Sequence, residues 1–148
     1  MVNRTGSPRM IAALALMLAG VIVVMPAVAQ SAPPPRAKAV LQMSESDPAK
    51  WNLALNNAKN IQADLGASNV DVEIIAYGPG IAMLKADSIV ANRVDEALAA
   101  GVGVVACENT MRGQKLTQAD MLAKIGYVPA GVVKIMQRQQ QGWAYIRP

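Results

Sequence analysis

The stretch GVGVVACENTM, residues 101–111, decides the fold because it places the only cysteine of the chain at the end of an apolar run. Residues 102–106 carry no polar side chain, which is typical of a parallel strand that is covered on both faces. We therefore expect the central strand of a parallel sheet here, with Cys107 at its carboxyl end. In open α/β sheets, ligands bind and chemistry takes place at that end of the strands.

The first 29 residues have the pattern of a cleaved signal peptide. Arg4 and Arg9 form a basic start, residues 10–25 are all apolar or small, and Ala27 and Ala29 give the small-x-small pattern of a signal peptidase site. The alternative is an uncleaved anchor, but these 16 residues are fewer than the roughly 20 that span a bilayer. We predict cleavage after Ala29, a periplasmic or secreted protein, and no membrane association after cleavage.

Composition narrows the function classes. The chain has 14 basic and 10 acidic residues, and losing Arg4 and Arg9 with the leader leaves 12 basic and 10 acidic residues. The remaining basic residues are scattered rather than clustered, so nucleic acid is not expected as a partner. The chain contains no histidine, which excludes hydrolase chemistry built on histidine and a zinc site of the ordinary ligand type. We expect no metal.

The residues after the leader predict a tether followed by one domain. Residues 30–37, QSAPPPRA, are rich in proline, which favours an extended and mobile segment. Residues 38–148 alternate between strand patterns and amphipathic helix patterns. The expected strands are residues 38–43, 70–76, 102–106, 127–128 and 143–146. This order predicts an α/β fold, a three-layer α/β/α sandwich with a mostly parallel five-stranded sheet.

Helix signals separate these strands. Asp47 is expected to cap the first helix, with Pro48 in its first turn and Gly66 after its last. A second helix runs from about Val90 to Gly101. A capping-box pattern, Thr117 to Asp120, predicts a helix over residues 118–125. The last helix, residues 131–141, is expected to bury Val132, Ile135 and Met136.

Polar residues alternate with apolar ones in residues 70–76. Asp71 and Glu73 fall on one face of this strand, so we expect it away from the sheet centre. The strand ends at Gly78-Pro79-Gly80. Backbone N–H groups of Gly78 and Gly80 are candidates for binding an anionic substrate, and the alternative is a turn chosen for glycine's conformational freedom.

Cys107 is the candidate catalytic residue, and two interpretations stay open. A thiolate near a helix N-terminus is stabilised by unpaired N–H groups, and Arg112 or Lys115 can add positive charge, whereas Glu108 raises the thiol pKa. Alternatively, Cys107 is a buried apolar residue. Asn109 and Thr110 are candidates for orienting a ligand, or for capping a turn. Trp143 and Tyr145 are expected to pack or to line a subunit interface.

Three segments of the chain resemble the DsrE/DsrF-like family, in its exported branch. They are CENTM at residues 107–111, YVPAG at 127–131 and QQQGWAYIRP at 139–148, and the resemblance covers about residues 38–148. It implies a doubly wound α/β sandwich and frequent homo- or hetero-oligomers. In relatives that include TusD, it also implies a cysteine that carries sulfane sulfur as a persulfide. That cysteine corresponds to Cys107.

Two function hypotheses follow. In the first, Cys107 accepts sulfane sulfur from a donor protein and passes it to a thiol acceptor, by nucleophilic transfer without a metal or organic cofactor. In the second, the protein is a non-catalytic ligand-binding or oligomeric assembly module with a structural cysteine. A homo-oligomer is expected in both. Thiol reactivity in the folded protein separates the two hypotheses.

Overall fold

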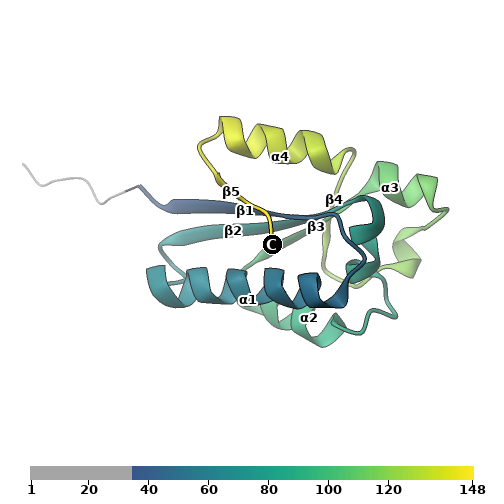
Figure 1. Ribbon diagram of the computed structural model, residues 1–148, viewed down its shortest axis with the longest axis horizontal. Coiled ribbons are helices and arrows are strands. Elements are labelled where there is room, and N and C mark those ends of the chain that lie inside the picture. Colours follow the sequence, from purple (N-terminus) through teal and green to yellow (C-terminus); the bar gives the residue numbers. More distant parts are fainter. Residues whose placement is uncertain (1–34) are drawn as a thin grey trace, which may run out of the picture. The chain divides into compact units, whose positions relative to one another are not determined.

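The computed structural model describes residues 35–148, so the predicted signal peptide and most of the predicted tether lie outside the described residues. Strands and helices alternate along this part of the chain (Figure 1). The strands are β1 (Ala37–Met43), β2 (Val70–Ala76), β3 (Gly103–Cys107), β4 (Gly126–Val128) and β5 (Ala144–Ile146). The helices are α1 (Pro48–Leu65), α2 (Ala91–Ala99), α3 (Glu108–Gly113) and α4 (Gly131–Gln140), with 3₁₀ helices η1 (Gly78–Leu84) and η2 (Gln118–Asp120).

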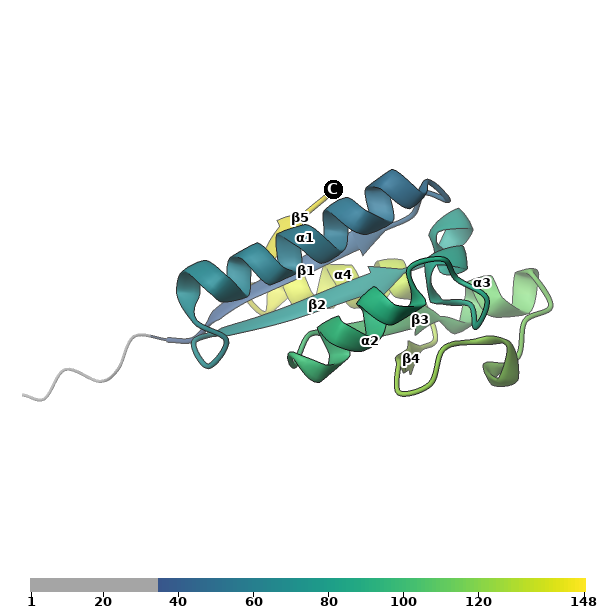
Figure 2. The same cartoon turned by 90° about the horizontal axis from the view of Figure 1, so that it is seen from below.

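The five strands form one parallel sheet in the order β4-β3-β2-β1-β5. Helices α1 and α2 cover one face of the sheet, and α4 covers the other (Figures 1 and 2). The last strand lies beside the first, with Ala144 opposite Ala39. The predicted three-layer sandwich with a parallel five-stranded sheet is therefore confirmed.

The central strand is β2, so two expectations about strand position are wrong. Residues 102–106 were expected at the centre, but β3 lies one place from the edge, where the three-residue β4 pairs with it. The polar residues of β2 do not mark an outer strand. Glu73 is buried, with 7% of its surface exposed, because Arg138 from α4 pairs with its carboxylate. Asp71, near the start of the strand, pairs with Arg36 at 2.9 Å.

The two faces of the sheet carry cores of different size. The larger core lies under α1 and α2 and includes Leu41, Leu55 and Ile74. The smaller core, under α4, has four buried members, which are Val40, Ile75, Val105 and Ile135. Helix α4 thus contributes one buried large side chain. The expected burial of Val132 and Met136 is wrong, since 60% and 52% of their surfaces are exposed.

Helix α1 begins and ends as the sequence predicts. The Asp47 side chain accepts a hydrogen bond from the Ala49 N–H, and Pro48 occupies the first helical position. Gly66 follows the last residue with φ +85°, a conformation that favours glycine.

The last residue of the predicted tether belongs to the sheet. Ala37, expected in the tether, is the first residue of β1.

The expected helix over residues 118–125 is wrong beyond its first turn. Thr117 and Asp120 do form the capping box, but the helical segment is the three-residue η2. The chain then pairs with residues that precede α2. The Leu122 N–H donates to Leu84 O, and the Ala86 N–H donates to Asp120 O, both at 2.9 Å. These bonds to a distant segment replace those of a continuing helix.

Candidate functional site

Cys107 lies where β3 ends and two helices begin. It is the last residue of β3 and the N-cap of α3, and 4% of its surface is exposed. Its Sγ accepts a hydrogen bond from the Gly131 N–H at 3.2 Å, and Gly131 is the first residue of α4. The sulfur therefore faces the amino end of α4, where backbone N–H groups have no partner within the helix.

Thr110 connects the sulfur to the turn after β2. Its Oγ1 accepts a hydrogen bond from the Gly78 N–H at 2.9 Å. The Thr110 hydroxyl keeps its own proton free for donation, and it is one of the groups that lower the pKa of the Cys107 thiol. Residues that follow β2, β3 and β4 are thus linked around Cys107, as expected at the carboxyl edge of a parallel sheet.

These contacts change the acidity of the thiol. Burial of Cys107 by itself raises the pKa, because an apolar environment disfavours the thiolate. Hydrogen bonds from the Gly131 N–H, from the Thr110 hydroxyl and N–H, and from the Asn109 N–H lower it. The lowering contributions exceed the effect of burial, so the pKa of Cys107 lies below its ordinary value. Cys107 is buried and yet loses its proton at lower pH than an ordinary thiol.

Gly131 cannot be replaced by a larger residue without moving the site. A Cβ at this position would lie 3.1 Å from the Tyr77 Cβ and 3.3 Å from both the Cys107 Cβ and the Ile75 Cγ2. Such distances are shorter than ordinary carbon–carbon contacts of about 3.5–4.0 Å. The absence of a side chain therefore lets the α4 backbone approach the sulfur.

Asn109 and Arg112 act mainly on each other and on the loop after β4. The Asn109 side-chain oxygen accepts a hydrogen bond from Arg112, and Arg112 is not among the groups that lower the Cys107 pKa. The Asn109 N–H donates to Pro129 O at 3.1 Å, which ties α3 to the loop before α4. Asn109 thus has a structural contact as well as an effect on the thiol.

Gly78 and Gly80 have their N–H groups bonded within the chain. Gly78 donates to Thr110, and Gly80 donates to Ser44 O and Tyr77 O, each at 3.1 Å. A Cβ on Gly80 would lie 2.3 Å from Met43 O, so close backbone packing requires this glycine. Both glycines shape the turn, and Gly78 also orients Thr110.

Sequence reasoning did not assign Gly131 and Tyr77 to the site. Gly131 was noted only within YVPAG, although this segment follows the strand beside β3. Because neighbouring parallel strands end at the same edge, residues after β4 must approach Cys107. To assign Gly131 to the site from the sequence, one would have needed to know that β4 pairs with β3.

A hollow of 210 Å³ lies elsewhere, between α1 and α2. It is lined by Leu55, Ala58, Lys59, Gln62, Arg93, Glu96, Ala97, Ala100 and Val102. Cys107 does not line it, so Cys107 and this hollow are separate features. Within residues 35–148, no three residues with Asp, Glu, Cys or His side chains are placed to hold a metal ion. No helix in the same residues combines the length and apolar character needed to cross a membrane.

Comparison with known proteins agrees with this architecture. No curated protein matches the sequence. The structure of MTH1491 from Methanobacterium thermoautotrophicum, described as a protein of unknown function, is similar with 37% identity and a TM-score of 0.72. That match covers 76% of this chain and 99% of MTH1491.

The structure of BT1422 from Bacteroides thetaiotaomicron, a conserved protein of unknown function, is similar in fold, with a TM-score of 0.58 and 14% identity. That match covers 75% of this chain and 94% of BT1422. The sequence pattern of the DsrE/DsrF-like family matches residues 27–148, which include every described element. The chain therefore belongs to the DsrE/DsrF-like family.

Proposed function

We propose that this protein is a sulfur carrier in which Cys107 holds sulfane sulfur as a persulfide. The observation that carries the proposal is the hydrogen bond from the Gly131 N–H to Cys107 Sγ at the carboxyl edge of the sheet. Membership of the DsrE/DsrF-like family suggests a role in sulfur relay. A cysteine that only fills space does not need a backbone N–H donor directed at its sulfur.

The transfer that we propose conserves atoms and charge. The Cys107 thiolate attacks the outer sulfur of a donor persulfide, R–S–SH, and forms Cys107–S–SH while R–S⁻ leaves. An acceptor thiolate then attacks the outer sulfur of Cys107–S–SH, takes it as a new persulfide, and regenerates the Cys107 thiolate. No metal, organic cofactor or external oxidant is consumed, since each step is an exchange at sulfur.

The surroundings of Cys107 suit both forms of the carrier. The N–H groups that lower the thiol pKa also stabilise the negative charge of a bound persulfide. Because Cys107 is 4% exposed, the donor sulfur reaches it only after a local movement. The first turn of α4 is the natural place for that movement, since Gly131 covers the sulfur.

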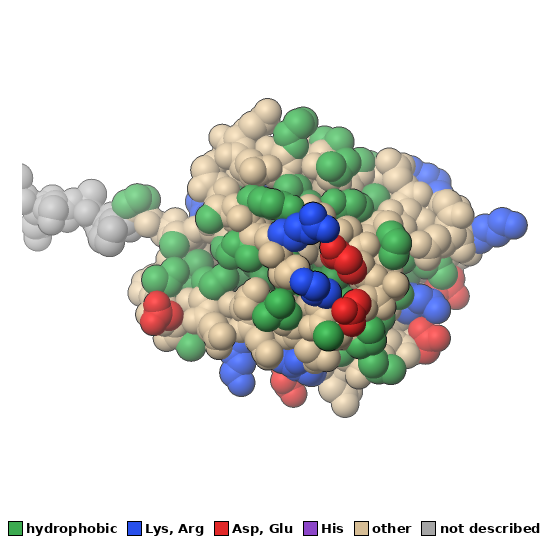
Figure 3. All heavy atoms as spheres, in the orientation of Figure 1, with side chains coloured by type: hydrophobic (Ala, Val, Ile, Leu, Met, Phe, Trp, Pro, Cys, Tyr) green, Lys and Arg blue, Asp and Glu red, His purple; other side chains and the backbone are tan. Residues whose placement is uncertain are grey.

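We also propose the setting in which the carrier works. Cleavage after Ala29 would release it into the periplasm or the exterior, where separate donor and acceptor proteins would exchange sulfur with Cys107. We propose a homo-oligomer, supported by the exposed apolar side chains Val132, Val133 and Met136 on α4. Hydrophobic side chains reach the surface over α4, in the upper part of Figure 3. N-terminal sequencing of the exported protein tests the cleavage site.

Intact mass spectrometry tests the carrier function. After exposure to polysulfide and removal of the excess, the wild-type protein is expected to gain about 32 Da for each bound sulfur. Cys107→Ser, which cannot form a persulfide, is the matched control and should gain none. Transfer of that mass to a thiol acceptor would complete the cycle. A native thiol that gains no sulfur and labels with iodoacetamide only after unfolding would refute the proposal.

The alternative function has one specific observation in its favour. The hollow between α1 and α2 has an apolar floor that includes Leu55 and Val102, and charged residues such as Lys59 and Glu96 at its rim. A non-catalytic binding module would use such a site for a small ligand, with Cys107 as a structural residue. If wild-type protein shows no mass shift after exposure to polysulfide, this binding function remains as the candidate.

A further inference from the structure

We propose that Glu73 and Arg138 are positioning residues for the Cys107 site. Their ion pair sets the register of α4 on the sheet and so holds the Gly131 N–H against Cys107 Sγ. The inference rests on the proposed function, because it concerns what keeps the carrier cysteine in its reactive setting. It assigns a role to two residues far from the sulfur in the sequence.

The apolar contacts of α4 are too few to fix its position alone. Of its large side chains, only Ile135 is buried, and Ile135 packs against Val40, Ile75 and Val105. Val132 and Met136 point to the surface. A single branched side chain gives little resistance to sliding, because the hydrophobic effect has no preferred direction. A directional interaction is needed to select one register.

The Glu73–Arg138 pair supplies that direction. Arg138 donates from Nε and Nη2 to the two carboxylate oxygens of Glu73, at 2.5 and 3.1 Å. This bidentate arrangement fixes orientation as well as distance. The Arg138 guanidinium also lies 4.3 Å from the centre of the Trp143 ring, which immobilises it from the other side.

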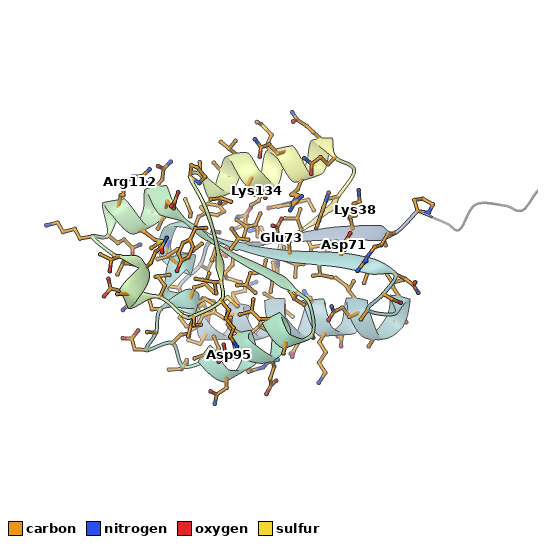
Figure 4. The ribbon with its side chains drawn as sticks, turned by 180° about the vertical axis from the view of Figure 1, so that it is seen from behind. Lys38, Asp71, Glu73, Asp95, Arg112 and Lys134 are labelled. Carbon is orange, nitrogen blue, oxygen red and sulfur yellow. The ribbon has the colours of Figure 1, made fainter. Side chains whose placement is uncertain are left out.

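Glu73 is fixed by the sheet itself. It lies in the central strand, on the side that faces α4 (Figure 4). The neighbouring residue on β3 is Gly103, and the Glu73 Cγ would be 3.4 Å from a Cβ at that position. Glycine thus leaves room for the carboxylate beside β3. If α4 moved away, this buried carboxylate would lose its partner, at a high cost in free energy.

The spacing of the contacts makes the two ends of α4 depend on each other. Gly131, Ile135 and Arg138 are separated by four and three residues, so they share one face of the helix. Gly131 and Arg138 are seven positions apart, which corresponds to about 10 Å along the helix. On the sheet, Glu73 and Tyr77 are four residues apart in an extended strand, or about 13 Å. Fixing Arg138 over Glu73 therefore places Gly131 beside Tyr77 and Cys107.

The test compares the pH midpoint of iodoacetamide labelling among variants of the full mature chain. In Arg138→Met, α4 loses its directional contact, the bond to the thiolate weakens, and the midpoint moves to higher pH. At pH values below both midpoints, labelling slows by about tenfold, as expected for a weakened hydrogen bond to a charged group. Arg138→Lys keeps the charge and should restore part of the change. Arg36→Met, which removes the exposed pair with Asp71, is the control and should leave the midpoint unchanged.

The direction of the midpoint shift is the decisive readout. Greater exposure of the thiol alone would lower the midpoint, because burial raises the Cys107 pKa, whereas loss of the hydrogen bond to the thiolate raises it. The Gly131 amide resonance offers a second readout, since it should titrate with Cys107 in the wild type and lose this response in Arg138→Met. If Arg138→Met does not fold, Glu73→Gln and Arg138→Lys are expected to shift the midpoint in the same direction by less. An unchanged midpoint in the folded variants overturns the inference. A wild-type thiol that never labels in the folded state overturns the carrier function instead.

Discussion

At Cys107, one hydrogen bond distinguishes a working thiol from a space-filling one. If the Gly131 N–H depends on this acceptor, Cys107→Ser should be tolerated because the hydroxyl oxygen accepts the same bond. Cys107→Val should be worse, since it leaves a buried N–H without a partner, at about 1–3 kcal/mol of unfolding free energy. Thermal unfolding of the two variants measures the difference. It should appear as a melting temperature several degrees lower for valine.

The reverse order would identify a purely apolar cysteine. In that case valine fits the pocket and serine buries an unpartnered hydroxyl.

The position of Cys107 at the edge of the sheet could be predicted from the sequence, because an apolar run that ends on the only cysteine indicates the end of a buried strand. The hydrogen-bond donors to its sulfur could not be predicted. Gly131 acts through its backbone and through the absence of a Cβ, neither of which leaves a chemical signature in the residue type.

At the scale of elements, β2 is expected to be the most protected part of the sheet. It is paired on both sides over most of its length, and residues from Val72 to Ala76 are buried. Its amides should therefore exchange with deuterium only by near-global unfolding, whereas β4 and β5, with three residues each at the edges, should exchange sooner. Hydrogen-exchange mass spectrometry with peptides covering each strand measures this order. Slower exchange in β4 than in β2 would contradict the sheet order.

The elements also show where sequence patterns were sufficient. Helix α1 followed from Asp47, Pro48 and Gly66 because caps are local interactions, readable from residues close in sequence. The structure of the segment after Thr117 could not be predicted from local sequence, because its backbone partners, Leu84 and Ala86, lie more than thirty residues earlier in the chain. Glu73 misled the strand order for the same reason. Its partner Arg138 is 65 residues away.

At the scale of the whole molecule, the outer face of α4 is the interface of the homo-oligomer that we propose. Met136→Glu places a charge among exposed apolar side chains on this helix and should dissociate the homo-oligomer. Ile89→Glu makes the same change at another exposed apolar residue, outside α4, and should not. Size-exclusion chromatography with light scattering gives the mass of each variant. A monomeric wild type at all concentrations, or equal dissociation by both variants, would exclude this interface.

The pairing of β5 with β1 has a consequence for how the protein folds. Ala39 and Ala144 face each other across this pair although they stand near opposite ends of the domain sequence. Such pairing raises the contact order, and β1 keeps an open edge until β5 has been synthesised and paired with it. The part of the sheet that contains β2, β3 and β4, and with it Cys107, precedes β5 in the sequence. During synthesis, the surroundings of Cys107 can therefore form before β5 closes this edge of the sheet.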